Sequence, residues 1–273
     1  FIRAFDMGVK GAAIATDISQ ALAGILAFAY ICLKAKHLIP KKDEYAVTKE
    51  DRSDLIQSAL AMGFMSCIVN IGTVILQRAI NNLGTDIVTA HTAARKIFDI
   101  LMFMLYIVGN AVTTFVSQNM GAGKYDRVHQ GVRDAIIINT IITTVMIVCG
   151  WLFSPALIRL VAGTSDPAII EPAVRYVRIG VTCFYVLGPL FVLRCAMQGM
   201  GRKIVPVMSS SMELVGKVLA VMILTPRLGY MGVTITEPII WFCCTLMLSI
   251  MYLSTPVEKL VAKRREAGVK ASC

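Results

Sequence analysis

The sequence has little charge and little of what a soluble domain needs. Only 16% of its 273 residues are charged and 56% are hydrophobic, whereas about 25% charge is usual in a soluble domain. Its eight cysteines are too few for a disulfide scaffold, and most lie in apolar runs. No heptad or G-X-Y period is sustained. These features exclude a soluble globule, a disulfide-rich domain, a coiled coil and collagen, and a polytopic helical membrane protein remains.

The sequence also lacks the motifs of common catalytic sites. It contains no GxxxxGK[ST] string, so ATP is not expected to drive it. His37, His91 and His129 are far apart and are expected at membrane surfaces rather than in a catalytic triad. Cys243 and Cys244 are adjacent and point to different faces of a helix, which does not suit zinc. We therefore expect no enzyme activity, no metal and no cofactor.

Seven apolar stretches are long enough to cross a bilayer, since a helix needs about 20 residues to span about 30 Å of hydrocarbon. None alternates with period two over its length, which favours helices over strands. The sequence predicts an all-α fold with transmembrane helices at 11–33, 55–76, 97–118, 135–158, 174–198, 204–225 and 232–253.

Lys and Arg residues are distributed unevenly between the two sides of this predicted bundle. The segment 34–54, the turns at Lys124 and Arg202 and the tail 254–273 lie on one side and hold most of the 27 basic residues. The positive-inside rule places this side, with the C-terminus, in the cytoplasm. Topology and anionic lipid account for the net charge of +10, so nucleic-acid binding is not expected.

The same topology predicts the domain organisation. Seven helices and a cytoplasmic C-terminus place Phe1 outside, which is unusual for a complete protein. Either the first span is a signal-anchor, or further helices lie upstream. The charged segment 34–54 separates one helix from six and resembles a joint between two lobes. We predict the last helix of an N-terminal lobe at 1–33, a cytoplasmic linker at 34–54, a six-helix lobe at 55–253 and a basic cytoplasmic tail at 254–273.

Four strings, in order along the chain, resemble motifs of the multidrug and toxin extrusion (MATE) transporters, most closely the bacterial DinF-like branch. They are GVKGAAIAT at 8–16, SQNMGAGK at 117–124, QGMGR at 198–202 with Pro206, and SMELVGK at 211–217 with GYMGV at 229–233. The resemblance covers nearly the whole chain. It implies the sixth helix and the second six-helix lobe of a monomeric twelve-helix transporter in the bacterial cytoplasmic membrane, whose missing N-terminal lobe would be its partner.

The resemblance implies a secondary antiporter that exports small organic cations or amphipathic drugs in exchange for protons or sodium by alternating access. A flippase for lipid-linked or polysaccharide precursors is the first alternative and would need a cationic cavity. A membrane scaffold or sensor is the second and would need a larger soluble region than 254–273. One branch of the family has cation-binding carboxylates in its seventh and tenth helices, but here the matching positions are Val69 or Asn70 and Leu187 or Gly188. The coupling ion therefore stays open.

Charged residues inside the predicted spans are candidates for ion coupling, because a central charge costs at least about 2.5–3.5 kcal/mol on insertion scales. These candidates are Asp17, Glu213 and Lys217. Asp17 can also sit at the outer interface. Glu213 and Lys217 are four residues apart and are expected to pair on one face of a helix. A structural ion pair and a coupling site both fit that spacing.

Uncharged polar residues and helix breakers complete the predicted site. Candidates for lining a cavity are Gln20, Ser66, Asn70, Thr73, Tyr106, Asn110, Arg194 and Gln198, and the same residues could instead join helices by hydrogen bonds. Gly188 and Pro189 predict a kink or hinge. Gln118, Asn119, Gly121 and Gly123 predict a capped cytoplasmic turn with two left-handed glycines, and a gating role is the alternative there.

Overall fold

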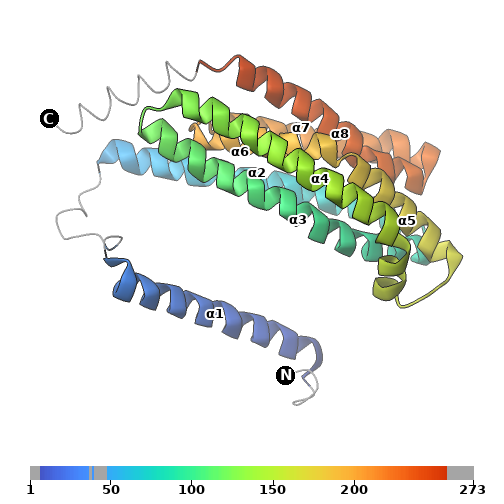
Figure 1. The fold of residues 1–273 in the computed structure, drawn as a ribbon. Coiled ribbons are helices and arrows are strands. Elements are labelled where there is room, and N and C mark those ends of the chain that lie inside the picture. Colours follow the sequence, from blue (N-terminus) through green and yellow to red (C-terminus); the bar gives the residue numbers. More distant parts are fainter. Residues whose placement is uncertain (1–6, 37–38, 40–47, 257–273) are drawn as a thin grey trace. The chain divides into compact units, whose positions relative to one another are not determined.

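The computed structural model describes residues 7–36, 39 and 48–256, and every regular element in that part of the chain is an α-helix (Figure 1). The helices are α1 (Gly8–Lys34), α2 (Lys49–Asn81), α3 (Thr85–Gly121), α4 (Tyr125–Ala162), α5 (Pro167–Thr182), α6 (Phe184–Gly199), α7 (Ile204–Leu228) and α8 (Tyr230–Leu253). The predicted all-α fold class is confirmed.

Two compact units divide the chain at Ile56. The first contains α1 and the beginning of α2, and the second contains the rest of α2 and the helices α3 to α8. α2 begins at Lys49, inside the segment that the sequence predicts as a linker. Charged residues with good helix propensity, such as Lys49 and Arg52, extend this helix beyond its apolar span. The predicted tail lies mainly outside the described residues.

Among the described residues, six helices are long and apolar enough to cross a membrane, and α5 with α6 passes the same test as a pair bent by 53°. Counting that pair as one span gives the seven predicted spans. The bend differs in position from the prediction, because α5 ends at Thr182 and α6 begins at Phe184, while Gly188 and Pro189 lie inside α6. A proline ring meets the carbonyl group one turn before it, so the distortion falls on its N-terminal side.

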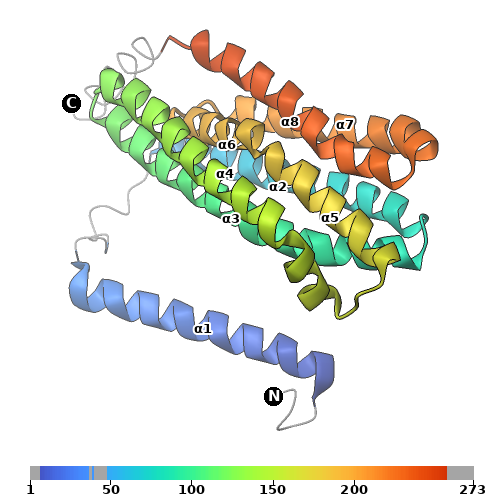
Figure 2. The ribbon, with the colours of Figure 1, turned by 45° about the vertical axis from the view of Figure 1, so that its right-hand side comes forward.

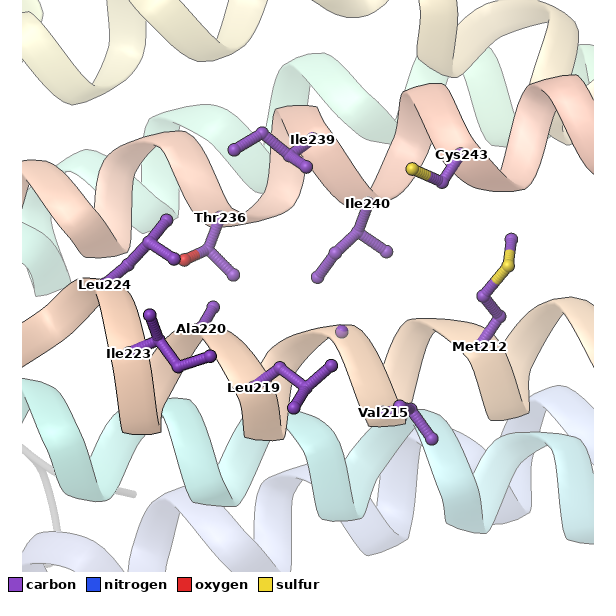
Figure 3. Close-up of a pocket in the computed structure, with 11 residues that line it drawn as sticks. Met212, Val215, Leu219, Ala220, Ile223, Leu224, Thr236, Ile239, Ile240 and Cys243 are labelled. Carbon is purple, nitrogen blue, oxygen red and sulfur yellow. The ribbon is translucent and has the colours of Figure 1, made fainter.

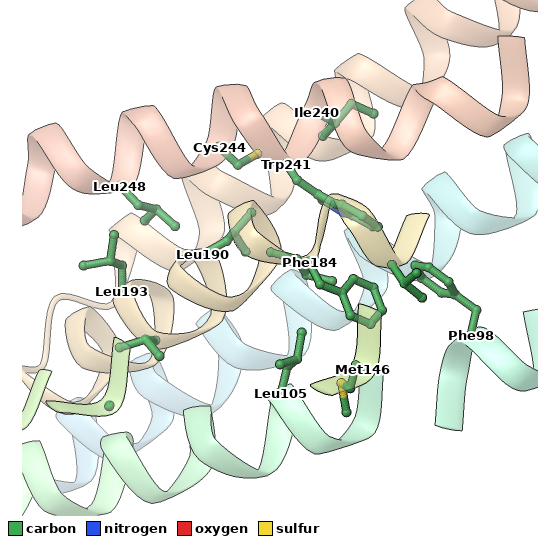
Figure 4. Close-up of a cluster of buried hydrophobic side chains, with 14 of the residues drawn as sticks. Phe98, Leu105, Met146, Phe184, Leu190, Leu193, Ile240, Trp241, Cys244 and Leu248 are labelled. Atoms are coloured by element: carbon green, nitrogen blue, oxygen red, sulfur yellow. The ribbon is translucent and has the colours of Figure 1, made fainter. Parts of the chain in front are cut away.

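The hydrophobic core of the second unit joins α3, α4, α5, α6 and α8 (Figure 4). Phe98 of α3 packs edge-on against Phe184 of α6, with ring centroids 4.9 Å apart, and stacks at 6.0 Å on Trp241 of α8. A Cβ added at Gly180 of α5 would lie 2.4 Å from the Phe98 ring. Small residues such as Gly180 thus allow the close helix approach on which packing in a bilayer depends.

The turn after α3 is the one predicted from residues 118–123. Gly123 has φ +70°, and the backbone N–H of Lys124 donates to the carbonyl of Asn119 at 2.8 Å, as in a Schellman motif. The Asn119 amide donates to the Phe115 carbonyl at 2.8 Å. Gly121 differs from the prediction, because it is still helical and only Gly123 of the two glycines is left-handed.

Candidate functional site

Charged side chains from four helices form a continuous series in the second unit. Their signs alternate, and each lies within 4 Å of the next. We call this series the charge chain; its members in order are Arg194 of α6, Glu213 and Lys217 of α7, Glu237 of α8, and Arg95 and Asp99 of α3.

The inner end of the charge chain surrounds Glu213. Lys217 Nζ lies 3.0 Å from Glu213 Oε1, and Arg194 Nη2 lies 3.4 Å from Oε2. Arg194 also donates to Ser209 Oγ at 2.7 Å. Only 13% of the Glu213 side chain and 4% of the Lys217 side chain are exposed. The expected Glu213–Lys217 pair is therefore present, and the second cationic partner, Arg194, favours the structural role for Glu213.

The middle of the charge chain centres on Glu237. Arg95 Nη1 lies 3.0 Å from both Glu237 oxygens, and Lys217 Nζ lies 3.9 Å from Oε1. The Tyr176 hydroxyl donates to Oε2 at 3.1 Å. Removing one partner of a buried pair typically costs about 3–5 kcal/mol, because the other charge stays buried without compensation. These contacts therefore join α3, α5, α7 and α8.

The outer end of the charge chain is weaker. Arg95 Nε lies 2.8 Å from Asp99 Oδ1, one turn further along α3, and 52% of the Asp99 side chain is exposed. An exposed pair at this helical spacing contributes about 0.3–0.5 kcal/mol. The charge chain is thus tightly paired inside the lobe and loosely paired at the surface.

α2 covers part of the charge chain through a glycine. A Cβ added at Gly72 would lie 3.0 Å from Lys217 Cδ and 3.5 Å from Leu214. The missing side chain leaves room for the Lys217 stem, whose ammonium then reaches both carboxylates.

Sequence reasoning missed three residues of this region. Glu237 lies inside the predicted span 232–253, and the insertion cost that singled out Glu213 applies equally to it. Arg95 lies just outside the predicted span 97–118, whereas α3 begins at Thr85 and includes it. His91, expected at a membrane surface, is buried, with Nδ1 3.2 Å from the Tyr230 hydroxyl. The positions of Arg95 and His91 have one cause: α3 continues beyond its most hydrophobic part, from which the span was predicted.

The predicted cavity-lining residues of the second unit lie on three adjoining helices. Tyr106 of α3 packs against Phe191 of α6 with ring centroids 5.9 Å apart, and Gln198 of α6 donates to Met62 of α2 at 3.5 Å. We call this side the polar face; its members are Ser66, Asn70 and Thr73 of α2, Arg194 and Gln198 of α6, and Tyr106 and Asn110 of α3.

The α2 part of the polar face adjoins α6. Ser66 and Thr73 share the side of α2 with Met62, since their spacings of four and seven residues fall on one helical face. Asn70 and Thr73 are exposed and donate to carbonyls of their own helix, at 2.8 and 3.1 Å. Their role in lining a cavity stays a prediction.

The remaining predicted residues lie elsewhere. Asp17 and Gln20 are exposed on α1, in the first unit. An apolar pocket of about 320 Å³ lies between α7 and α8, lined by residues such as Leu219, Ile223 and Ile239 (Figure 3). Its lining suits hydrocarbon and does not include the charge chain. The polar face and the charge chain are therefore the candidate functional site.

Helices long enough to span a membrane, internally paired charges and a polar face that is partly exposed together define a polytopic α-helical membrane protein. The family model of MatE matches residues 61–222, and the chain belongs to this family.

Curated relatives and solved structures agree with that assignment. The chain is 26% identical to the probable multidrug resistance protein YpnP of Bacillus subtilis (strain 168), over 74% of its length and 44% of the relative's. It is 24% identical to the probable multidrug resistance protein NorM of Thermotoga maritima, over 74% and 43%. The crystal structure of MATE in complex with MaL6 matches with a TM-score of 0.84 at 18% identity, over 95% of this chain and 59% of that one. The chain thus spans about half the length of the curated relatives it matches.

Proposed function

We propose that this chain forms part of a secondary exporter that moves small organic cations or amphipathic drugs across the cytoplasmic membrane in exchange for protons or sodium. Membership of the MatE family and the similarity to proteins named for multidrug resistance support an efflux role. The basic turns at Lys124 and Arg202 favour an orientation with the C-terminus in the cytoplasm.

The observation that carries this proposal is the contrast between the inside and the surface of the second unit. Its buried charges are satisfied by one another across α3, α6, α7 and α8, so the helices can move together as a rigid body. The polar face has exposed members on α2 and α3, and its α6 members, Arg194 and Gln198, are half-buried. Alternating access needs both a rigid lobe and a wettable surface facing the substrate path.

The coupling ion is proposed to bind outside the charge chain. Glu213 has two cationic partners within 3.4 Å, so a proton or sodium ion would have to displace one of them. The positions that carry acidic residues in one branch of the family hold Val69 or Asn70 and Leu187 or Gly188. We propose membership of the DinF-like branch and a coupling carboxylate in helices beyond this chain.

A lipid-precursor flippase is less well supported. The substrate cavity of a flippase should present unpaired positive charge to the anionic headgroup of the lipid precursor. Arg95, Arg194 and Lys217 each lie within 3.4 Å of a carboxylate, which neutralises them.

Transport by the intact protein in liposomes tests the proposal. We expect ethidium preloaded in the vesicles to exchange against an imposed proton or sodium gradient, and to stop when the gradient is collapsed by an ionophore. Vesicles without protein are the control. A protein that moves ethidium under neither gradient contradicts the proposed function.

A further inference from the structure

An exposed carboxylate lies within the span of α3. Asp99 belongs to the helix Thr85–Gly121, which is long and apolar enough to cross a membrane, yet 52% of its side chain is exposed. A charge that faces hydrocarbon is costly, so an exposed carboxylate on this spanning helix favours a surface in contact with water or a polar ligand.

The exposed surface of α3 divides into two parts that support this assignment. Tyr106, Asn110 and Ser117 follow Asp99 at intervals of seven, four and seven residues, so they share its face, and all are exposed. Ile100, Met104 and Ile107 form the adjacent apolar strip and are 69%, 50% and 48% exposed. The apolar strip suits lipid, and the polar strip suits an aqueous path.

Aromatic rings accompany the carboxylate. Phe103 lies one turn beyond Asp99 and is 59% exposed, and Tyr106 lies in the following turn and is 46% exposed. A carboxylate beside exposed aromatic faces is a suitable arrangement for a large organic cation, because the ring faces attract positive charge and the carboxylate neutralises it.

Arg95, the present partner of Asp99, can be displaced at a small cost in free energy. Arg95 holds Asp99 through Nε, but its Nη1 donates at 3.0 Å to both oxygens of the buried Glu237. If another cation takes Asp99, Arg95 keeps its buried partner, so neither charge is left uncompensated in the lobe interior. The cation paired with Asp99 is therefore exchangeable, whereas the Arg95–Glu237 pair stays in place.

We propose that Asp99, Phe103 and Tyr106 form a subsite for a monovalent aromatic or quaternary organic cation, with Arg95 as the resident counter-ion that the cation replaces. This inference deepens the proposed function, on which it rests, by assigning a substrate contact to this chain. Asn110, on the same face, would bound the subsite on the side toward the end of α3.

Equilibrium binding of tetraphenylphosphonium to the intact protein purified in detergent tests the subsite without requiring transport. We expect Asp99→Asn to weaken binding by about tenfold, equivalent to about 1.4 kcal/mol. Asp99→Glu, which keeps the charge, should restore most of the affinity. Asp86→Asn removes an exposed carboxylate from the first turn of the same helix and should leave binding unchanged.

A second pair of variants tests the aromatic contribution. Phe103→Leu keeps an apolar side chain but removes the ring, and we expect it to weaken binding severalfold. Met104→Leu, on the neighbouring apolar strip, should have no effect. Equal effects of the two substitutions would indicate a general change in the helix rather than a cation contact.

The outcomes separate the subsite from the proposed function. Binding that is unchanged in both Asp99→Asn and Phe103→Leu, or absent in the unaltered protein, overturns the subsite. Ethidium transport that persists in these variants with unchanged KM also overturns it and leaves the exporter intact. Loss of all ethidium transport by the unaltered protein contradicts the exporter itself.

Discussion

The two buried carboxylates of the charge chain each compensate two cations but differ in burial and in their other contacts. Glu237 compensates both Arg95 and Lys217 and also accepts from Tyr176. Glu213 compensates Lys217 and Arg194, but Lys217 keeps Glu237 within 3.9 Å and Arg194 keeps Ser209. After the loss of Glu237, Arg95 would keep only the exposed Asp99. Because Glu237 is also the more buried carboxylate and accepts from Tyr176, its loss should be the more damaging of the two.

Glu237→Gln is expected to destabilise the protein by up to about 3–5 kcal/mol, because it leaves Arg95 paired only with the exposed Asp99 and Lys217 paired only with Glu213. Thermal unfolding of the detergent-solubilised protein measures this loss. The control is Asp134→Asn, which removes the exposed partner of Arg133 and should change stability by less than about 1 kcal/mol. Equal losses in both variants would show that the buried chain contributes no more than a surface pair.

Glu213→Gln should lower stability less than Glu237→Gln and should leave the pH dependence of transport unchanged in shape. The reason is that Glu213 has two cationic partners within 3.4 Å, so a proton would have to displace one of them. Efflux measured across a series of external pH values checks this. Loss of the pH dependence with retained binding of tetraphenylphosphonium would return Glu213 to the coupling site.

At the scale of the elements, glycines decide how closely helices approach. A side chain at Gly72 would press on the Lys217 stem, whereas Gly63, on the same helix, has no atom within 4 Å of an added Cβ. We expect Gly72→Leu to destabilise the protein by about 1–3 kcal/mol, as overpacking usually does. Gly63→Ala should be neutral or stabilising by up to about 1 kcal/mol, through helix propensity. Thermal unfolding of the two variants distinguishes packing from helix propensity. A Gly63→Ala variant less stable than Gly72→Leu would contradict the close packing at Gly72.

The elements also show what the sequence can and cannot predict. The spans follow from apolar length alone, and the Glu213–Lys217 pair follows from helical spacing. The partners of Glu237 do not, because Arg95 and Glu237 meet only when α3 packs near α8. The bend at Cys183 also depends on packing, since a proline predicts a distortion but not how far upstream the helix accommodates it.

At the scale of the whole molecule, the second unit carries polar residues on one side and its own charge balance inside. This combination should let it insert and fold in a membrane, while transport needs a second surface opposite the polar face. The chain covers 44% of its relative YpnP and 59% of the matched MATE structure.

We therefore expect residues 1–273, expressed alone, to purify from membranes as a folded helical protein with a cooperative thermal transition. In liposomes they should show no gradient-driven ethidium transport, whereas the intact protein should. Transport by residues 1–273 alone would contradict the proposal that this chain forms only part of the exporter, because it would then supply the whole substrate path. If instead residues 1–273 aggregate while the intact protein transports ethidium, the expectation that this part folds on its own is wrong.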